Sequence, residues 1–289
     1  MRCRGATRTL VPLEINSAKS MPESIPDILV SLRDLAQVLF IDRLNPRRIQ
    51  ASKAACAACR KLRFHSRSRI RPLSWPDLFQ KLGIHHVDLV SLPSPLTDFG
   101  GATSKDEYYA LAALARGLQP GIIFEFGTYL GVGTLTMAAN TPPACKIYTL
   151  DLSDAVEPDL IRKLGADDKT FIGGSRHRVG QAFLQSPFAD RIVQIRDDSM
   201  TFRAESRVTN VDLAFVDGGH SLPVVAKDSE NALRILSSTG TIIWDDYGPW
   251  HPGVVTYLEE FSASREVYSI TGTNFVIHSR RWPSGMERK

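Results

Sequence analysis

The fold of this 289-residue chain is decided by one stretch of sequence, Ile122-Ile123-Phe124-Glu125-Phe126-Gly127-Thr128-Tyr129-Leu130-Gly131-Val132-Gly133-Thr134. An apolar run ends in an acidic residue and a glycine, and two further glycines then open a helical pattern. This order predicts a strand, a tight turn and the N-terminus of a helix. An α/β sheet uses this unit to hold an adenosine-bearing cofactor at its carboxyl edge.

The spacing of the glycines indicates which cofactor is bound. A dinucleotide fingerprint needs G-x-G-x-x-G, so that amides at the start of the helix face a pyrophosphate. Here the pattern from Glu125 to Gly133 is E-x-G-x-x-x-G-x-G, and no order of these glycines gives the dinucleotide pattern. A looser turn beside an acidic residue suits a cofactor with no phosphate and with a positive centre. S-adenosylmethionine fits that description, and a nicotinamide dehydrogenase is disfavoured.

The composition is that of an ordinary globular protein, with 43% hydrophobic and 23% charged residues. No apolar run approaches the roughly 20 residues that span a bilayer, so we expect no transmembrane segment. The N-terminus lacks the apolar core of a secretory signal, and we expect a cytoplasmic protein. Cys56-Ala-Ala-Cys59 has metal-ligand spacing, but a structural zinc site usually needs a second pair. We therefore interpret it as two small residues on an Ala-rich helix.

The net charge of +4 is unevenly spread along the chain. Residues 43–71 hold ten Lys or Arg and no acid, which leaves 25 basic and 31 acidic residues elsewhere. Such a block could bind RNA, an anionic membrane surface or an acidic substrate. It could equally be a solvated helix face or an arm that packs against the acidic remainder. No aromatic-interleaved nucleic-acid motif surrounds it, so nucleic acid is the less favoured partner.

Three regions follow from the pattern along the chain. Residues 1–24 carry no periodicity and are expected to form a flexible leader. Residues 25–100 are expected to form a helical, basic N-terminal extension that ends in a Pro-punctuated linker with one short helix near 76–82. We place the domain boundary near residue 100, so that 101–289 form the catalytic domain.

Strands and helices alternate regularly after residue 100. Five strands alternating with helices require a parallel sheet with right-handed crossovers. A closing pair of strands, separated by Thr271-Gly272-Thr273, is expected to add an antiparallel edge. The expected helices are 104–118, 132–140, 222–237 and 252–263, and the expected strands are 122–126, 146–150, 191–196, 211–216, 241–244, 267–270 and 274–278.

Acidic residues follow several of these strands, where open α/β sheets bind their ligands. Asp151 lies 24 residues after Gly127, a distance typical of an acid that accepts both ribose hydroxyls of a bound nucleoside. After the next strand, Asp198 could accept the adenine amino group and Ser199 could contact a ring nitrogen. An equally weighted alternative is that this pair caps the helix that follows.

Asp217 and the pair Asp245-Asp246 follow two strands that we expect to be neighbours, with ends about 5 Å apart. Three converging carboxylates would raise each other's pKa unless a cation compensates them, and oxygen-only ligands suit Mg²⁺. The metal would hold a substrate hydroxyl and lower its pKa. His220, three residues after Asp217, is a candidate general base, and a capping or surface histidine is the alternative.

Four motifs together resemble class I S-adenosylmethionine-dependent methyltransferases of the family-24 type: F-E-F-G-T-Y-L-G-V-G-T, Y-T-L-D-L, D-L-A-F-V-D-G-G-H-S and T-I-I-W-D-D-Y-G-P-W. The resemblance covers about residues 101–280. This region is similar to the sugar O-methyltransferases of macrolide and aminocoumarin pathways. It implies a Rossmann-like seven-strand sheet of order 3-2-1-4-5-7-6 whose last strand is antiparallel. It also implies a cofactor site lined by Glu125, Gly127, Gly131, Asp151 and Ser199, to which we add Thr128 and Asp198.

In the metal-dependent relatives, the acid after strand four and the acidic pair after strand five bind Mg²⁺. Those positions correspond to Asp217, Asp245 and Asp246. Catechol-type relatives carry a lysine base three residues after the first metal ligand, where this chain has His220.

The resemblance and the residues together predict methyl transfer from S-adenosylmethionine to a hydroxyl oxygen of a small molecule, such as a sugar or a secondary metabolite. An RNA methyltransferase that uses residues 43–71 is one alternative, and a non-catalytic cofactor-binding scaffold is another. A homo-oligomer is compatible with the sequence.

Overall fold

The computed structural model describes residues 64, 67–88, 90–91, 103–153, 169 and 178–282. They belong to a compact unit that begins at Arg60. The leader 1–24, the helices expected before residue 64 and Cys56-Ala-Ala-Cys59 lie outside the described residues, so those expectations stay predictions.

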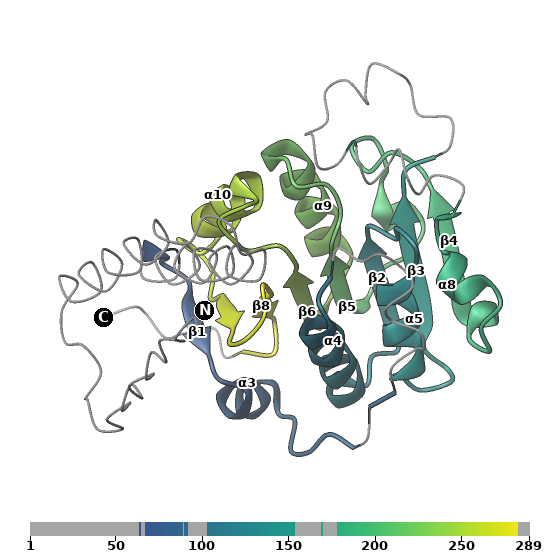
Figure 1. Cartoon of the computed structure of the whole chain (residues 1–289), viewed down its shortest axis with the longest axis horizontal. Coiled ribbons are helices and arrows are strands. Elements are labelled where there is room, and N and C mark those ends of the chain that lie inside the picture. Colours follow the sequence, from purple (N-terminus) through teal and green to yellow (C-terminus); the bar gives the residue numbers. More distant parts are fainter. Residues whose placement is uncertain are drawn as a thin grey trace, which may run out of the picture. The chain divides into compact units, whose positions relative to one another are not determined.

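A twisted eight-stranded sheet forms the centre of this unit, in the order β1-β7-β8-β6-β5-β2-β3-β4 (Figure 1). Strands β2 to β6 run parallel to one another, whereas β8 runs antiparallel to both β6 and β7. The strands are β1 (Arg71–Leu73), β2 (Ile122–Phe126), β3 (Lys146–Asp151), β4 (Ile192–Arg196), β5 (Val211–Val216), β6 (Leu236–Trp244), β7 (Tyr268–Ile270) and β8 (Val276–Ser279).

The predicted sheet order is confirmed for the seven expected strands, and an eighth strand extends it. The sequence suggested that the closing antiparallel pair forms the edge of the sheet. Strand β1 instead pairs in parallel with β7 and lies at that edge. The sequence missed β1 because it has three residues and contains Pro72. Proline removes a donor from the ladder and is tolerated in a strand at a sheet edge, which is where β1 lies.

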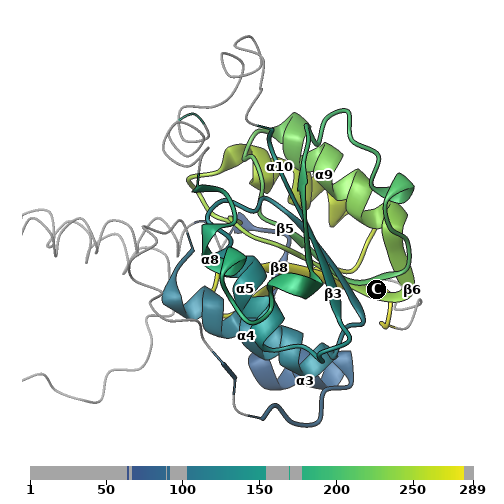
Figure 2. The same cartoon turned by 90° about the vertical axis from the view of Figure 1, so that its right-hand side faces the viewer.

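Helices cover both faces of the sheet (Figure 2). The face that carries α3 (Trp75–Leu82), α4 (Lys105–Leu118) and α5 (Val132–Ala139) lies opposite the face that carries α9 (Leu222–Ile235) and α10 (Pro252–Phe261). Ser104 caps α4, accepting from the amide of Glu107, whose own carboxylate accepts from the amide of Ser104. The shorter helices are α8 (Gln181–Leu184), which packs against α5, η2 (Ala189–Arg191), which directly precedes β4, and η3 (Ala204–Ser206), which packs against α9.

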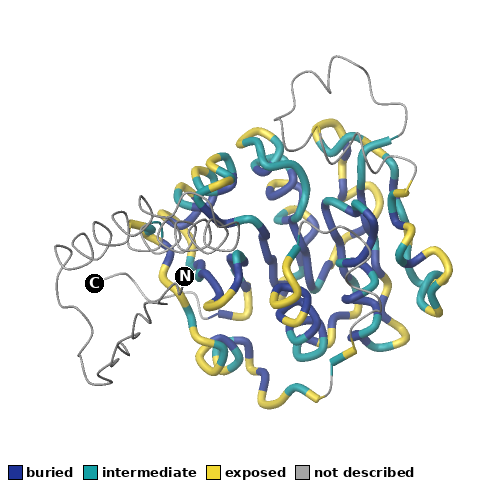
Figure 3. The backbone as a smooth tube through the Cα atoms, in the orientation of Figure 1, coloured by how far each residue is buried: buried dark blue, intermediate teal, exposed yellow. Residues whose placement is uncertain are grey.

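The hydrophobic core lies in two layers, one on each side of the sheet. Successive residues of β2 point to opposite faces: Ile123 packs in the layer under α3, α4 and α5, and Phe124 packs in the layer under α9 and α10. Burial on both faces explains why the strand is continuously apolar. Figure 3 shows the buried residues concentrated along the central strands. None of the helices within the described residues is long and apolar enough to cross a membrane.

Helix α3 and strand β1 precede the expected boundary near residue 100, yet both pack into this unit. Leu78 on α3 is fully buried in the layer formed with α4 and α5.

We therefore expect Leu78→Ala to lower the free energy of unfolding by about 2–5 kcal/mol, because a buried leucine is replaced by a cavity. Chemical denaturation should show the loss in a single transition. Gln80→Ala, on the exposed side of the same helix, should change stability by less than about 0.5 kcal/mol. A loss confined to a separate, weaker transition would contradict this assignment.

Candidate active site

The turn after β2 requires glycine at its first position. Gly127 has a φ of 97°, and a Cβ atom there would lie 1.8 Å from the carbonyl oxygen of Asp217. Its amide donates to the carbonyl of Leu150 at 2.9 Å, and the amide of Asp217 donates to the carbonyl of Phe126 at 2.8 Å. Because β2 lies between β3 and β5, this turn touches the chain that leaves β5 and the end of β3. The predicted glycine turn is therefore the place where the loops of the site meet.

Glu125 is a buried support for this turn. Its side chain is 1% exposed, and one carboxylate oxygen accepts hydrogen bonds from the hydroxyls of Thr134 and Thr149, the latter at 2.5 Å. The hydroxyl of Thr128 lies 2.6 Å from that of Thr149 and extends the chain of hydrogen bonds into the turn. Burial raises the pKa of Glu125 to about 7, although the two threonine hydroxyls act in the opposite direction. Glu125 thus ties β2, β3 and α5 together, and a direct contact with the cofactor stays a prediction.

Two further residues define the cofactor side of the turn. Gly131, with a φ of 84°, is the residue before α5 and donates its amide to the carbonyl of Thr128 at 2.7 Å. Asp151 accepts from the amides of Tyr129 at 2.6 Å and Leu152 at 2.7 Å. The structure therefore brings Asp151 next to the turn, as the spacing from Gly127 predicts. Burial raises the pKa of Asp151, while these backbone amides favour its ionised form.

The loop after β4 carries Asp198 and Ser199. The amide of Asp197 donates to the carbonyl of Asp151 at 2.9 Å, which holds this loop beside the ribose candidate. Asp198 accepts from the amide of Met200 at 2.9 Å, within a turn. This local bond resembles a helix cap. Capping of the following helix is the alternative to adenine binding that the sequence left open.

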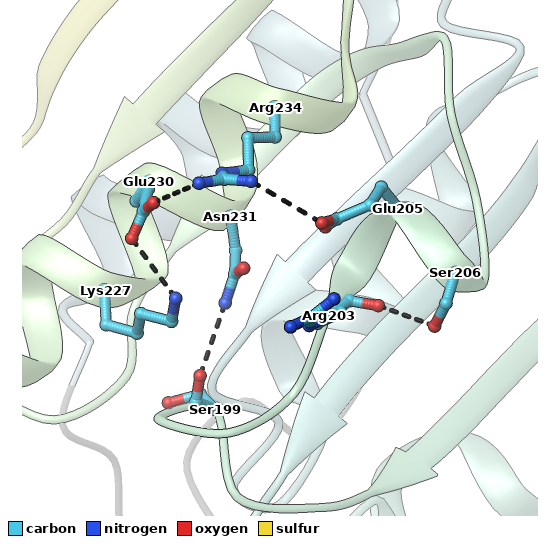
Figure 4. A network of polar contacts seen from close by, with 8 residues as sticks. All are labelled: Ser199, Arg203, Glu205, Ser206, Lys227, Glu230, Asn231 and Arg234. Atoms are coloured by element: carbon cyan, nitrogen blue, oxygen red, sulfur yellow. Dashed lines mark hydrogen bonds and ion pairs between the residues drawn. The ribbon is translucent and has the colours of Figure 1, made fainter.

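Helix α9 anchors the same loop. Asn231 donates to the carbonyl of Ser199 at 3.3 Å, and Arg234 lies 3.7 Å from the carboxylate of Glu205 (Figure 4). The hydroxyl of Ser199 also bonds to Asp228, a buried acid whose pKa is raised to about 7, chiefly by burial. Of the two adenine candidates, Ser199 is thus fixed to α9 by its contacts with Asn231 and Asp228.

The loops after β5 and β6 bring acidic side chains close to one another. Burial raises the pKa of Asp217 well above its usual range, and Asp245 and Asp246 raise it further. Asp245 is 5% exposed, and its pKa is also raised well above its usual range by burial, then by Asp246 and Glu107. Mutual repulsion of this kind is relieved by a nearby positive charge. The site is therefore suited to a cation or to a cofactor with a positive centre.

His220 is paired with Asp246 in the structure. Its Nε2 lies 2.8 Å from Oδ2 of Asp246, and Nε2 of His251 lies 3.4 Å from the other carboxylate oxygen. The two imidazole rings are 4.2 Å apart at their centroids. In the part of the chain that the structure describes, these three residues form the group whose metal-ligand atoms all lie within 4.8 Å of one another. Of the three aspartates expected to bind Mg²⁺, Asp246 belongs to this group, and Asp217 and Asp245 lie outside it.

Some contacts of the site were not predicted from the sequence. The pairing of His251, a residue that the sequence places in the loop after the aspartate pair, with Asp246 is one, because it depends on how α10 folds back after β6. Glu107 is another: its carboxylate accepts from the amide of Asn274 at 2.8 Å, close to Asp245. The Ser-x-x-Glu pattern at 104–107 predicts its capping role but not this second contact. The threonines that bond to Glu125 were also missed, although Thr149 is the register partner of Glu125 on β3.

Comparison with known proteins agrees with the motifs. Residues 124–247 match the sequence model of a family described as a methyltransferase domain. This range contains every site residue predicted from the sequence. The prediction of a methyltransferase domain is confirmed over this segment. No curated protein matches the chain at a significant level.

Three solved structures illustrate the similarity. The O-methyltransferase TomG of Streptomyces achromogenes, in complex with SAM, is 18% identical, with 61% of this chain and 80% of that chain covered at a TM-score of 0.43. A putative O-methyltransferase of Klebsiella pneumoniae is 20% identical, with 62% of this chain and 81% of that chain covered at a TM-score of 0.47. A SAH-bound methyltransferase of Podospora anserina is 19% identical, with 84% of this chain and 99% of that chain covered at a TM-score of 0.46.

The burial of Glu125 gives stability a measurable pH dependence. Its folded-state pKa of about 7 lies above the ordinary value of 4.5, so the folded state binds more protons between these values. The contribution of Glu125 to stability is therefore present at low pH and is lost as the pH rises towards 7. In Glu125→Gln, the decline of unfolding free energy between pH 5 and 7 should be shallower by up to about 1.4 kcal/mol per pH unit. Denaturant titrations across this range measure the slope. Glu260→Gln, exposed on α10, should leave it unchanged, and an unchanged slope in Glu125→Gln would contradict the assignment.

Proposed function

We propose that this protein, whose residues 124–247 carry a methyltransferase domain, transfers a methyl group from S-adenosylmethionine to a hydroxyl oxygen of a small molecule. The observation that carries the proposal is the contact between Gly127 and the backbone of Asp217. This contact joins the predicted cofactor turn to the loop that carries His220. His220 in turn pairs with Asp246 of the loop after β6.

The cofactor side of the site fits a nucleoside with a positive centre. Both oxygens of Asp151 accept one backbone amide each, and each retains acceptor capacity for a ribose hydroxyl. The buried carboxylates nearby favour a cation over a pyrophosphate. S-adenosylmethionine supplies an electrophilic methyl group on a sulfonium sulfur. We propose that it is held by Glu125, Gly127, Thr128, Gly131, Asp151, Asp198 and Ser199.

The acceptor side contains a histidine oriented by a carboxylate. The hydrogen bond from Nε2 of His220 to Asp246 favours the tautomer whose lone pair is on Nδ1. In the proposal, Nδ1 would take the hydroxyl proton of the acceptor as its oxygen bonds to the methyl carbon. The bond from that carbon to the sulfonium sulfur would break at the same time, and the neutral thioether would leave. Asp246 then stabilises the imidazolium that results. Asp217 is the second catalytic residue of the proposal, through the metal site described next.

A divalent cation is the finer part of the proposal. The proposed ligands of Mg²⁺ are Asp217, Asp245 and Asp246. The raised pKa values of Asp217 and Asp245 support this assignment. A cation beside them would relieve the repulsion between these carboxylates and would lower the pKa of a bound hydroxyl. The small-molecule acceptor is likewise a proposal, with a sugar or secondary metabolite as the first class to test.

Cofactor binding tests the first part of the proposal. Isothermal titration should show that the full chain binds S-adenosylmethionine, and Asp151→Ala should weaken binding at least about tenfold, because charge-assisted hydrogen bonds are worth about 1.5–3 kcal/mol. Asp151→Asn should give a smaller loss. Asp190→Ala, an exposed aspartate of η2, should bind as the unaltered chain does. Absence of binding by the unaltered chain would support the scaffold alternative instead, with a cofactor-binding domain that has degenerated.

Methyl transfer tests the second part. A screen over hydroxylated small molecules and RNA should reveal transfer to a small molecule, and His220→Asn should lower kcat by about 10²–10⁴-fold, the usual contribution of a general base. The affinity of His220→Asn for S-adenosylmethionine should stay the same. Undiminished kcat in this variant would remove His220 from the mechanism. Transfer to RNA alone, with affinity that falls steeply with salt, would favour the nucleic-acid alternative.

The same screen, run with Mg²⁺ and with a chelator, tests the cation. Turnover should require Mg²⁺ and should be lost in Asp217→Ala while cofactor binding is retained. Turnover that persists in chelator would remove Mg²⁺ from the proposal and leave methyl transfer itself intact.

A further inference from the structure

We infer that His220, Asp246 and His251 form a binding site for a divalent transition ion such as Zn²⁺ or Co²⁺, and that its occupancy stops methyl transfer. The binding itself stands on the geometry of the three residues. The inhibition rests on the proposed function, because it assumes that His220 accepts the proton of the acceptor.

The three side chains come from separate elements and converge on one point. His220 lies in the loop after β5, Asp246 lies in the loop after β6, and His251 is the residue before α10. The carboxylate of Asp246 lies between the two imidazoles, with one oxygen 2.8 Å from His220 and the other 3.4 Å from His251. Their ligand atoms all lie within 4.8 Å of one another, so a single ion can be reached by all three.

The chemistry of these donors selects the kind of ion. Imidazole nitrogen is a favoured ligand of zinc, cobalt, nickel and copper, whereas Mg²⁺ prefers a shell of oxygens and keeps several of its waters. Two imidazoles and one carboxylate give three protein ligands and leave a further position for water, the arrangement of many zinc sites that exchange a ligand. The group is therefore better matched to a transition ion than to Mg²⁺.

The backbone holds this group in place before any ion binds. Asp246 has a φ of 62°, and its amide donates to the carboxylate of Asp245 at 2.6 Å. His251 donates its amide to the carbonyl of Gly248 at 3.1 Å and accepts from Val255 in the first turn of α10.

Helix α10 is also fixed against the loop that carries His220. A Cβ atom on Gly253 would lie 2.4 Å from the carbonyl of His220, so this first turn packs closely against that loop. The side chains of His220, Asp246 and His251 are 17%, 22% and 21% exposed, which allows an ion to enter from solvent.

Binding of such an ion would change what the site can do. The ion would replace the proton that His220 shares with Asp246, so the carboxylate could no longer orient the imidazole or stabilise its charged form. Asp246 is also one of the three proposed Mg²⁺ ligands, so the two ions compete for it. Inhibition should therefore weaken as the concentration of Mg²⁺ rises.

Titration of the metal-free full chain with Co²⁺ tests the site without cofactor or acceptor. Cys56→Ser/Cys59→Ser is the background, which removes the two thiolates that have metal-ligand spacing. Visible absorption of bound Co²⁺ should saturate at one ion per chain. His251→Ala should weaken binding at least about tenfold, since even outer-shell partners of a metal typically contribute 10- to 100-fold. His251→Asn, which retains a residue that can cap α10, should weaken it similarly.

His86→Ala provides the matched control, because this histidine is 80% exposed and lies far along the chain from the group. It should bind Co²⁺ as the background does. Equal affinity in His86→Ala, His251→Ala and Asp246→Asn, or no saturable binding in the background, would overturn the site. Both results leave the proposed methyl transfer untouched, because the assay contains neither of its substrates.

The activity arm uses Zn²⁺ in the methyl-transfer assay. Zn²⁺ should inhibit the background enzyme, and His251→Ala should need at least about tenfold more Zn²⁺ for the same fractional inhibition of its own rate. Equal sensitivity of the two proteins would overturn the inhibitory role.

Discussion

The close approach of two backbones holds the rest of the site together. Gly127 leaves β2 with its Cα packed against the carbonyl of Asp217, where no side chain could fit. Because β2 and β5 are neighbours in the sheet, this contact sets how far the loop after β2 can stand from the loop after β5. The two proposed halves of the reaction, cofactor and acceptor, are thus separated by a distance fixed in the main chain. Side-chain motion alone cannot alter it.

A second constraint is the number of carboxylates that this edge of the sheet has to accommodate. Burial raises the pKa of Glu125, whose carboxylate accepts from two threonine hydroxyls, and Asp151 is held by backbone amides. Asp217 and Asp245 have weaker compensation, and their pKa values rise well above the usual range. Asp246 is distinguished from them by its two histidine neighbours. The site therefore contains acids in three different electrostatic situations, which suits the proposed division among a nucleoside, a cation and a base.

The sequence predicted the parts of the fold that depend on local pattern. The apolar run of β2, the capping Ser104 and the glycine turn each carry a local signal, and together they place most of the sheet. What could not be predicted depends on contacts between distant segments. Strand β1 could not be predicted because it contains Pro72, and its pairing with β7 joins residues almost 200 positions apart. The meeting of His251 with Asp246 depends on the path of α10, which no spacing in the sequence specifies. Glu125 was placed in the cofactor site by motif, and only its register with Thr149 reveals that it is a buried support.

The short strand β1 has a consequence for how molecules of this protein behave next to one another. It closes one end of the sheet, and its exposed Arg71 and Pro72 lie where another chain could otherwise add a strand. Proline offers no amide hydrogen and arginine brings a charge, two devices that discourage intermolecular β-pairing. Without these three residues, β7 would be the terminal strand, and its Tyr-Ser-Ile sequence would offer a neutral ladder to passing chains. A segment that the sequence suggests is a mere linker therefore also carries two features that oppose edge-to-edge pairing.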